Sequence, residues 1–259
     1  MFTVPDFLSA KGAGRQIALL ACYDAPTARI VEAAGIDAVL VGDSVAMVIH
    51  GRRSTTDATL EMLCAHTAAV RSGSSDLFII ADMPFMTTRS GVSAGAEAAA
   101  SLIRAGANAV KIEGADGHGE LIPALTGGGI PVMGHLGLQP QSINLLGRYA
   151  RQGKTAEQAD KLKRDALQLE ELGCFAMVME CVSPRLANEL CPELGIPAIG
   201  IGSGDGWNGQ ILVAHDLFGL NPSGAPSFAK PYAQGFGLFE AAASAWIADV
   251  RNAKRGGAV

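Results

Sequence analysis

Short runs of hydrophobic residues recur along the chain, separated by longer alanine-rich segments. The runs are rich in Val, Ile and Leu and several end at glycine, which is typical of buried β-strands. They predict eight strands: Ile17–Cys22, Ala38–Gly42, Leu77–Asp82, Ala109–Gly114, Pro131–Gly137, Ala176–Cys181, Pro197–Gly204 and Ile211–Gly219. The segments between or after them predict helices: Ala25–Ala34, Thr59–Arg71, Ser93–Ala105, His118–Leu125, Thr155–Leu172, Pro184–Leu190 and Leu238–Asn252.

The stretches AAGIDAVLVG, RAGANAVKIEG and ELGCFAMVMEC each contain a helix end, a glycine and a buried strand. Such repeated units predict a parallel sheet, and eight of them fit one (β/α)₈ TIM-type barrel spanning residues 1–259. The eighth unit follows the pattern least well. A doubly wound sheet is the competing fold, but it predicts a glycine-rich turn after the first strand, where ACYDAP stands instead.

Two segments lie outside the repeating pattern. Residues 137–155 are too long for an ordinary strand-to-helix turn, so we expect an active-site flap there. The final residues, KRGGAV, predict a mobile C-terminal tail.

Composition narrows the classes of partner. The chain is 49% hydrophobic with a net charge of −5, and its basic residues are scattered except near the C-terminus. These features argue against a nucleic-acid partner. The five cysteines form no C-x-x-C pair, which favours reduced thiols and a cytoplasmic location. No stretch predicts export or membrane insertion. So apolar a barrel also favours a homo-oligomer.

Ionisable residues stand at the ends of several predicted strands, and in a barrel all these ends meet at one rim. The residues that could carry chemistry there are Asp43, Ser44, Asp82, Lys111, Glu113, His135 and Glu180. Clustered carboxylates repel one another unless a cation compensates them. Because the available ligands are oxygen atoms, Mg²⁺ or Mn²⁺ is favoured over zinc. Asp43 and Asp82 are the leading ligands, with Glu113 a third, direct or through water.

Each residue also has a simpler interpretation. Asp43 could cap the following segment, and Asp82, just before Met83-Pro84, could be a turn residue. Lys111 and Glu113 share one face of a strand and could form a buried salt bridge. His135 alone is as compatible with a structural role as with a catalytic one. The combination over several strands favours a site. Asp24, before Ala25-Pro26, is expected only to cap a helix.

The motifs V-G-D-S, A-D-M-P-F-M, V-K-I-E-G, G-H-L-G-L-Q-P-Q and V-M-E-C occur in this order. With them the chain resembles the ketopantoate (3-methyl-2-oxobutanoate) hydroxymethyltransferase family over nearly its whole length. The resemblance implies a (β/α)₈ enzyme that transfers a hydroxymethyl group from 5,10-methylenetetrahydrofolate to 3-methyl-2-oxobutanoate, giving 2-dehydropantoate for pantothenate and coenzyme A. It also implies a homo-oligomer, since family members form decamers.

Carried over by motif, the resemblance ties Asp43 and Asp82 to Mg²⁺, with Glu113 beside them. Ser44 and Lys111 would hold the 2-oxo acid, and Glu180 would accept a proton from its C3 atom to give a Mg²⁺-stabilised enolate. His135 could assist a proton transfer or bind the new hydroxyl group. Ala46 and Asn208 depart from the family pattern, as does the C-terminus after Asp249.

Three alternatives remain open. A metal-free aldolase would use Lys111 to form a Schiff base. A metal-dependent carbon–carbon lyase of the isocitrate lyase-like kind would share the barrel and the metal. A barrel without turnover would bind metal and 2-oxo acid only.

Overall fold

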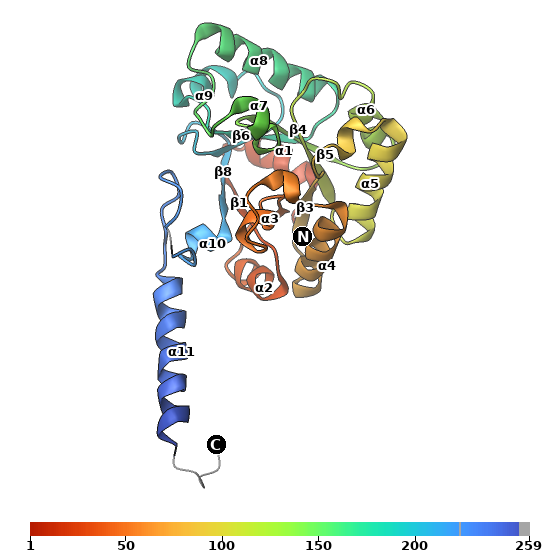
Figure 1. The fold of residues 1–259 in the computed structure, drawn as a ribbon. Helices are drawn as coiled ribbons and strands as arrows, with labels where there is room; N and C mark the ends of the chain where they lie inside the picture. Colours follow the sequence, from red (N-terminus) through yellow and green to blue (C-terminus); the bar gives the residue numbers. More distant parts are fainter. Residues whose placement is uncertain (223, 254–259) are drawn as a thin grey trace. The chain divides into compact units, whose positions relative to one another are not determined.

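The computed structural model describes residues 1–222 and 224–253. Its strands pair in parallel and in sequence order to form a closed barrel, as Figure 1 shows from one end. The strands are β1 (Ile17–Ala21), β2 (Ala38–Val41), β3 (Phe78–Asp82), β4 (Ala109–Glu113), β5 (Val132–Gly137), β6 (Ala176–Glu180), β7 (Ala198–Ile201) and β8 (Gly209–Val213). The prediction of a (β/α)₈ barrel is therefore confirmed.

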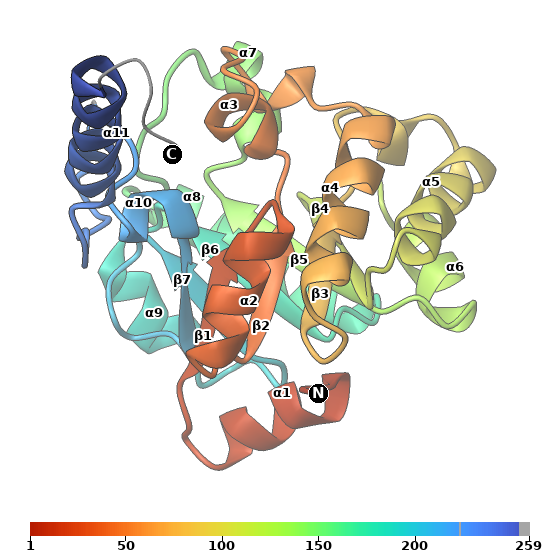
Figure 2. The same cartoon turned by 90° about the horizontal axis from the view of Figure 1, so that it is seen from below.

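Helices α2, α4, α5, α6, α8 and α9 surround the barrel (Figures 1 and 2). The helices of the described residues are α1 (Val4–Gly12), α2 (Ala25–Ala33), α3 (Val45–Val48), α4 (Leu60–Gly73), α5 (Val92–Arg104), α6 (Leu121–Gly127), α7 (Ile143–Leu146), α8 (Ala156–Glu171), α9 (Pro184–Leu190), α10 (Ala214–Leu217) and α11 (Gly235–Asn252). Single 3₁₀ turns are η1 (Thr55–Asp57), η2 (Thr87–Arg89) and η3 (Pro140–Ser142). The predicted eighth strand ran too far, because α10 begins where β8 ends.

Side-chain caps start several of these helices. Asp24 accepts a hydrogen bond from the Thr27 backbone N–H at the start of α2, so the expected capping role of Asp24 is confirmed. Thr155 and Gln158 form a reciprocal capping box at the start of α8. These local signals set where each helix begins after its strand.

Alternate residues of the strands point into the barrel. On β3 the inward residues are Phe78, Ile80 and Asp82, and on β4 they begin with Ala109. The same alternation places Lys111 and Glu113 inward at the C-terminal end of β4. The barrel interior is therefore apolar near the strand N-termini and ionisable near the strand C-termini.

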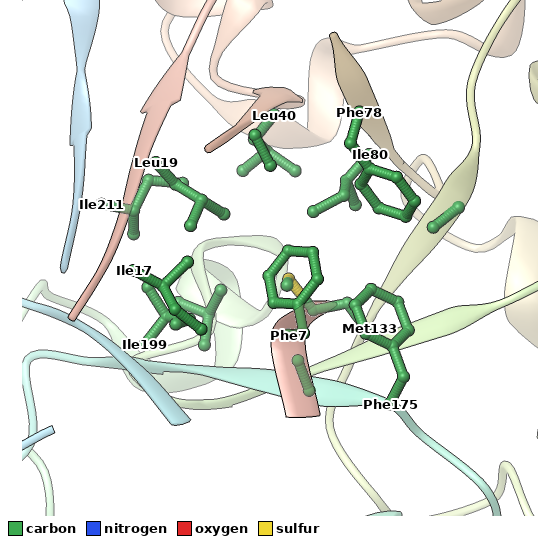
Figure 3. Packing of buried hydrophobic residues seen from close by; sticks show 14 of the residues in the cluster. Phe7, Ile17, Leu19, Leu40, Phe78, Ile80, Met133, Phe175, Ile199 and Ile211 are labelled. Carbon is green, nitrogen blue, oxygen red and sulfur yellow. The ribbon is translucent and has the colours of Figure 1, made fainter. Parts of the chain in front are cut away.

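Helix α1, which sequence reasoning missed, covers the N-terminal end of the barrel. Figure 2 shows α1 at the end opposite to α3 and α7. Its Phe7 is fully buried and lies among inward residues of the strands in Figure 3. The ring centroid of Phe7 is 5.6 Å from that of Phe78 and 5.1 Å from that of Phe175, both in edge-to-face geometry. This aromatic cluster closes the core at that end.

Contacts divide the chain into two compact units, residues 1–212 and residues 213–259. The second unit contains α10 and α11, and α11 buries only its first residue, Gly235. No helix in the described parts of the chain has the length and hydropathy to cross a bilayer. The predicted mobile tail lies in residues 254–259, outside the described residues.

Candidate active site

The C-terminal ends of β3 to β6 carry one cluster of buried ionisable side chains. Asp82 lies beside Lys111 in the β3–β4 register, and Glu113 beside His135 in the β4–β5 register. Asp82, Lys111 and His135 are each at most 4% exposed. Glu180, at the end of β6, is more open to solvent, with its side chain 18% exposed. Catalytic groups of (β/α)₈ enzymes lie at this end of the barrel.

Lys111 pairs with Asp82 and not with Glu113. Its Nζ lies 3.0 Å from Asp82 Oδ1 and 3.1 Å from His135 Nδ1. Burial lowers the pKa of Lys111, but the charges of Asp82, Glu113 and Asp43 outweigh burial and raise it above its ordinary value. Lys111 is therefore a fixed cation in the middle of the cluster.

Asp43 and Asp82 meet at the ends of β2 and β3. The backbone N–H of Asp43 donates a 2.9 Å hydrogen bond to Asp82 Oδ2. Burial and the nearby charges of Asp82 and Glu113 raise the pKa of Asp43 well above its usual range. Burial also raises the pKa of Asp82, against the attraction of Lys111. Three acidic groups thus share one buried site with a shortage of positive charge.

These carboxylates fit a hard divalent cation. All their donor atoms are oxygen, and the buried Asp82 Oδ1 takes part in no hydrogen bond despite its contact with Lys111. Across residues 1–222 and 224–253, no three His, Cys, Asp or Glu side chains form a complete set of metal ligands. A cation held here would take at most two protein carboxylates and complete its shell with other oxygens, as Mg²⁺ commonly does.

His135 connects the two glutamates of the cluster. Its Nδ1 lies 3.3 Å from Glu113 Oε1, and its Nε2 lies 3.1 Å from Glu180 Oε2. Burial and the charge of Lys111 lower the pKa of His135, but the contacts with Glu113 and Glu180 overcome them and raise it to about 9. The contact with His135 outweighs burial at Glu113 and lowers the pKa of Glu113. The imidazole therefore fixes both carboxylates in position.

Ser44 follows Asp43 and begins α3. Its Oγ shares a 2.7 Å hydrogen bond with the hydroxyl group of the fully buried Tyr23. A Cβ atom at Gly42 would lie 2.9 Å from Ser44 Oγ and 3.4 Å from Asp82 Oδ2. The absence of a side chain at Gly42 thus leaves room for the Ser44 hydroxyl near the carboxylates. The structure accordingly brings together the residues that the sequence singled out.

Gln141, in the segment 137–155, belongs to this site although sequence reasoning gave it no role. The Gln141 side-chain amide donates to Asp43 Oδ2 at 2.8 Å and to the Met83 carbonyl at 3.0 Å, and its backbone N–H donates to Glu113. Burial raises the pKa of Tyr149, aided by the charges of Glu180, Asp43 and Glu113. Gln141 lies in the quoted motif G-H-L-G-L-Q-P-Q, which is the signal that could have identified it.

Other polar residues serve the framework. Ser203 of G-I-G-S-G is fully buried, accepts a hydrogen bond from the Val182 N–H and donates to the Met179 carbonyl. Asn208, a departure from the family pattern that lies just before β8, accepts hydrogen bonds from Lys11 and from the N–H of Ala198 at the start of β7. Neither side chain contacts the ionisable cluster in these bonds.

The ketopantoate hydroxymethyltransferase family model matches residues 1–255. The chain belongs to this family. Curated relatives named 3-methyl-2-oxobutanoate hydroxymethyltransferase include one from Bacillus licheniformis, 46% identical over 97% of this chain and 91% of the relative. Another, from Legionella pneumophila subsp. pneumophila, is 47% identical over 96% of this chain and 95% of the relative.

Solved structures of other enzymes share the fold of this family member. One is 2,3-dimethylmalate lyase, described as a PEP mutase/isocitrate lyase superfamily member, with a TM-score of 0.62 and 17% identity over 99% of this chain and 90% of that one. A phosphonopyruvate hydrolase complex with oxalate and Mg²⁺ has a TM-score of 0.63 and 13% identity over 98% of this chain and 100% of that one. At such low identities the likeness concerns the fold alone.

Proposed function

We propose that this chain transfers a hydroxymethyl group from 5,10-methylenetetrahydrofolate to 3-methyl-2-oxobutanoate and so forms 2-dehydropantoate for pantothenate synthesis. Membership of a hydroxymethyltransferase family supports the reaction and the one-carbon folate donor. The single observation that carries the proposal is the buried cluster in which Lys111 lies beside Asp82 while Glu180, partly open to solvent, lies against His135. It offers a cation for an anionic substrate and a base beside it.

Asp43 and Asp82 would hold Mg²⁺, with Glu113 acting through a water molecule. Glu113 is already engaged by His135 and by the Gln141 N–H, which favours the indirect role. When bound, Mg²⁺ would polarise the 2-oxo group of the substrate as a Lewis acid. The hydrogen bond from Gln141 would keep Asp43 oriented.

Lys111 and Ser44 would bind the 2-oxo acid. The ammonium group is buried and stays protonated, so it can attract the substrate carboxylate without first losing a proton. The Ser44 hydroxyl is held by Tyr23 and can donate to a substrate oxygen. Together they would orient the acid with C3 toward β6.

Glu180 would accept the proton from C3, because it is the carboxylate of the cluster most open to solvent. The resulting carbanion forms a carbon–carbon bond to the methylene carbon of the folate, and water supplies the oxygen of the new hydroxyl group. Both bonds from that carbon to the folate nitrogens break, and tetrahydrofolate leaves with the proton taken from C3 and one proton from water on these nitrogens. His135 would position Glu180 through its Nε2 contact, and with a pKa raised to about 9 it can donate this hydrogen bond as an imidazolium ion at neutral pH. This role deepens the earlier expectation that His135 assists a proton transfer.

Specific observations weigh against the alternatives. A Schiff-base aldolase needs a neutral lysine, whereas Asp82 and its neighbours favour the charged form of Lys111. A carbon–carbon lyase shares the fold, but the sequence relatives at 46% and 47% identity are hydroxymethyltransferases. Folate-independent cleavage of a 2-oxo or 2-hydroxy diacid would favour the lyase.

The decisive experiment is proton exchange at C3 of 3-methyl-2-oxobutanoate in D₂O, followed by NMR with Mg²⁺ present. The wild-type chain should exchange the proton, and Glu180→Gln should slow exchange by about 10²- to 10⁴-fold while Mg²⁺ still binds. Glu171→Gln, at an exposed glutamate, serves as the matched control. A wild-type chain that binds metal and acid without exchange or product would be a barrel without turnover.

We further propose that the protein is a homo-oligomer, as family members are, and that it works in the cytoplasm. Helix α11 supports the first point, because large apolar side chains on it are exposed: Phe236, Leu238, Phe239, Trp246, Ile247 and Val250. All five cysteines are free, which supports a reducing compartment. Sedimentation of the full chain tests the oligomeric state.

A further inference from the structure

Two histidines outside the candidate active site lie in direct contact. His50 is exposed in the segment after α3, and His66 lies in the middle of α4. Their Nε2 atoms are 2.8 Å apart, and the rings stand almost perpendicular at 87° with centroids 5.1 Å apart. The two histidines are 16 positions apart in the sequence, a spacing that is typical of no metal-binding motif.

The tautomer of His66 follows from its second contact. His66 Nδ1 lies 2.7 Å from the backbone carbonyl oxygen of Tyr23, which can only accept a hydrogen bond. Nδ1 therefore carries the proton, and in the neutral ring Nε2 presents a lone pair toward His50. A histidine whose other nitrogen donates to a backbone carbonyl is the usual arrangement of a metal ligand.

We infer that His50 and His66 form a binding site for a borderline-soft transition-metal ion such as Zn²⁺, Ni²⁺ or Cu²⁺. In the metal-free state, His50 Nε2–H donates to His66. In the metal-bound state the His50 proton moves to Nδ1 through solvent, and both Nε2 lone pairs point at the ion. This change of tautomer leaves the net charge of His50 unchanged.

The distances allow such a site with a small adjustment. Metal–nitrogen bonds of about 2.0–2.1 Å at a tetrahedral angle separate the two nitrogens by about 3.3 Å. The pair must therefore open by about half an ångström, which the exposed His50 side chain can accommodate. Within the described residues no third His, Cys, Asp or Glu completes the set, so water fills the other positions. The site is consequently weak and exchangeable.

The site differs from the carboxylate cluster in its ligand chemistry. Imidazole nitrogens favour zinc, nickel and copper, whereas carboxylate oxygens favour Mg²⁺. A bound ion would link the segment after α3, which contains His50, to α4. Ser44 directly precedes α3 in the sequence. Binding should therefore slow amide hydrogen exchange in residues 45–54.

Titration of the tag-free chain with Ni²⁺, at saturating Mg²⁺ to occupy the carboxylates, tests the proposal by calorimetry. Removing only an outer partner of a metal ligand typically costs 10–100-fold in affinity, so His50→Ala should weaken Ni²⁺ binding by at least about tenfold. His50 is the position to change, because its loss leaves the bond between His66 and Tyr23 intact. Arg52→Ala, at an exposed residue of the same segment, should bind Ni²⁺ like the wild type.

A spectroscopic measurement completes the test without any activity assay. Cu²⁺ bound to the wild-type chain should show electron paramagnetic resonance coupling to two imidazole nitrogens, and His50→Ala should remove one of them. Equal Ni²⁺ affinity in His50→Ala and wild type would overturn the proposal. So would a Cu²⁺ signal abolished by Asp82→Asn but unchanged by His50→Ala, which would place the ion at the carboxylate cluster.

Discussion

The two ends of the barrel are built from the same strands and the same inward alternation, yet they contain opposite chemistry. At the N-terminal end Phe7, Phe78 and Phe175 pack edge to face with their rings buried (Figure 3). At the C-terminal end the corresponding inward positions hold Asp82 and Lys111. Two residues along β3, from Ile80 to Asp82, separate an aliphatic layer from an ionic one.

This difference separates stability from function along the barrel axis. Burial of apolar surface at the N-terminal end stabilises the fold, and the apolar side chains need no hydrogen-bond or ionic partner. At the C-terminal end, burial of charge is costly, and the pairs formed there seldom repay it. We therefore expect the ionic layer to serve binding and catalysis. The aromatic layer supplies the stability that offsets the cost of burying these charges.

The largest effect is expected from the aromatic layer. Phe7→Ala removes a fully buried ring and should lower the free energy of unfolding by about 3–5 kcal/mol. Urea denaturation measures it. Leu8→Ala, one position away on the same helix and 44% exposed, should change stability by about 0.5 kcal/mol or less. Equal losses in both would mean that α1 stabilises the barrel as a whole and not through Phe7.

The barrel itself could be predicted because each strand run is short, apolar and preceded by a helix and a glycine. Helix α1 could not, because a single helix before the first strand breaks the repeat that carried the prediction. Its local signals were present: Thr3 and Asp6 form a reciprocal capping box, and Pro5 lies in the first turn. What the sequence lacks is any sign that Phe7 reaches residues as distant as Phe175.

Within the ionic layer, Lys111→Ala and Glu113→Ala should have different consequences. Loss of a charged hydrogen-bond partner is worth about 1.5–3 kcal/mol, or about ten- to a hundredfold in affinity. Lys111→Ala should weaken binding of 3-methyl-2-oxobutanoate more than binding of Mg²⁺, and Glu113→Ala should do the reverse. Calorimetric titration with each ligand measures both. If each variant lost both ligands equally, the two residues would have a structural role only.

A carboxylate of the ionic layer should be replaceable with a gain in stability. Asp43→Asn removes a buried charge that burial, Asp82 and Glu113 all disfavour, while Gln141 can still donate to the remaining carbonyl oxygen. In EDTA the variant should be about 0.5–2 kcal/mol more stable than the wild type. Asp57→Asn, at an exposed aspartate, should be neutral.

Addition of Mg²⁺ extends this measurement. The cation should stabilise the wild type, because it binds only the folded chain. Asp43→Asn should gain less from Mg²⁺, having lost a ligand. A variant that is less stable than the wild type in EDTA would contradict the view that this layer costs stability.

The members of the site were predictable from strand ends, but their pairing was not. Sequence placed Lys111 and Glu113 on one face, two residues apart, and so left a salt bridge between them open. The register instead puts Asp82 beside Lys111 and His135 beside Glu113. Pairing depends on the stagger between neighbouring strands, which the hydrophobic pattern of each strand leaves free. Gln141 was not predicted as a site residue, because a neutral amide on a long loop has no electrostatic signature in the sequence.

The smallest effect is expected at Tyr23, a neutral residue whose hydroxyl group holds Ser44 beside the ionic layer. Tyr23→Phe removes the hydroxyl group that holds Ser44 and should cost about 0.5–1.5 kcal/mol of stability. Because this bond holds Ser44, a proposed substrate-binding residue, KM for the 2-oxo acid should rise severalfold. Tyr232→Phe, at a tyrosine 74% exposed, should alter neither quantity. An unchanged KM in Tyr23→Phe would remove Ser44 from the substrate-binding residues and leave Lys111 to bind the acid without it.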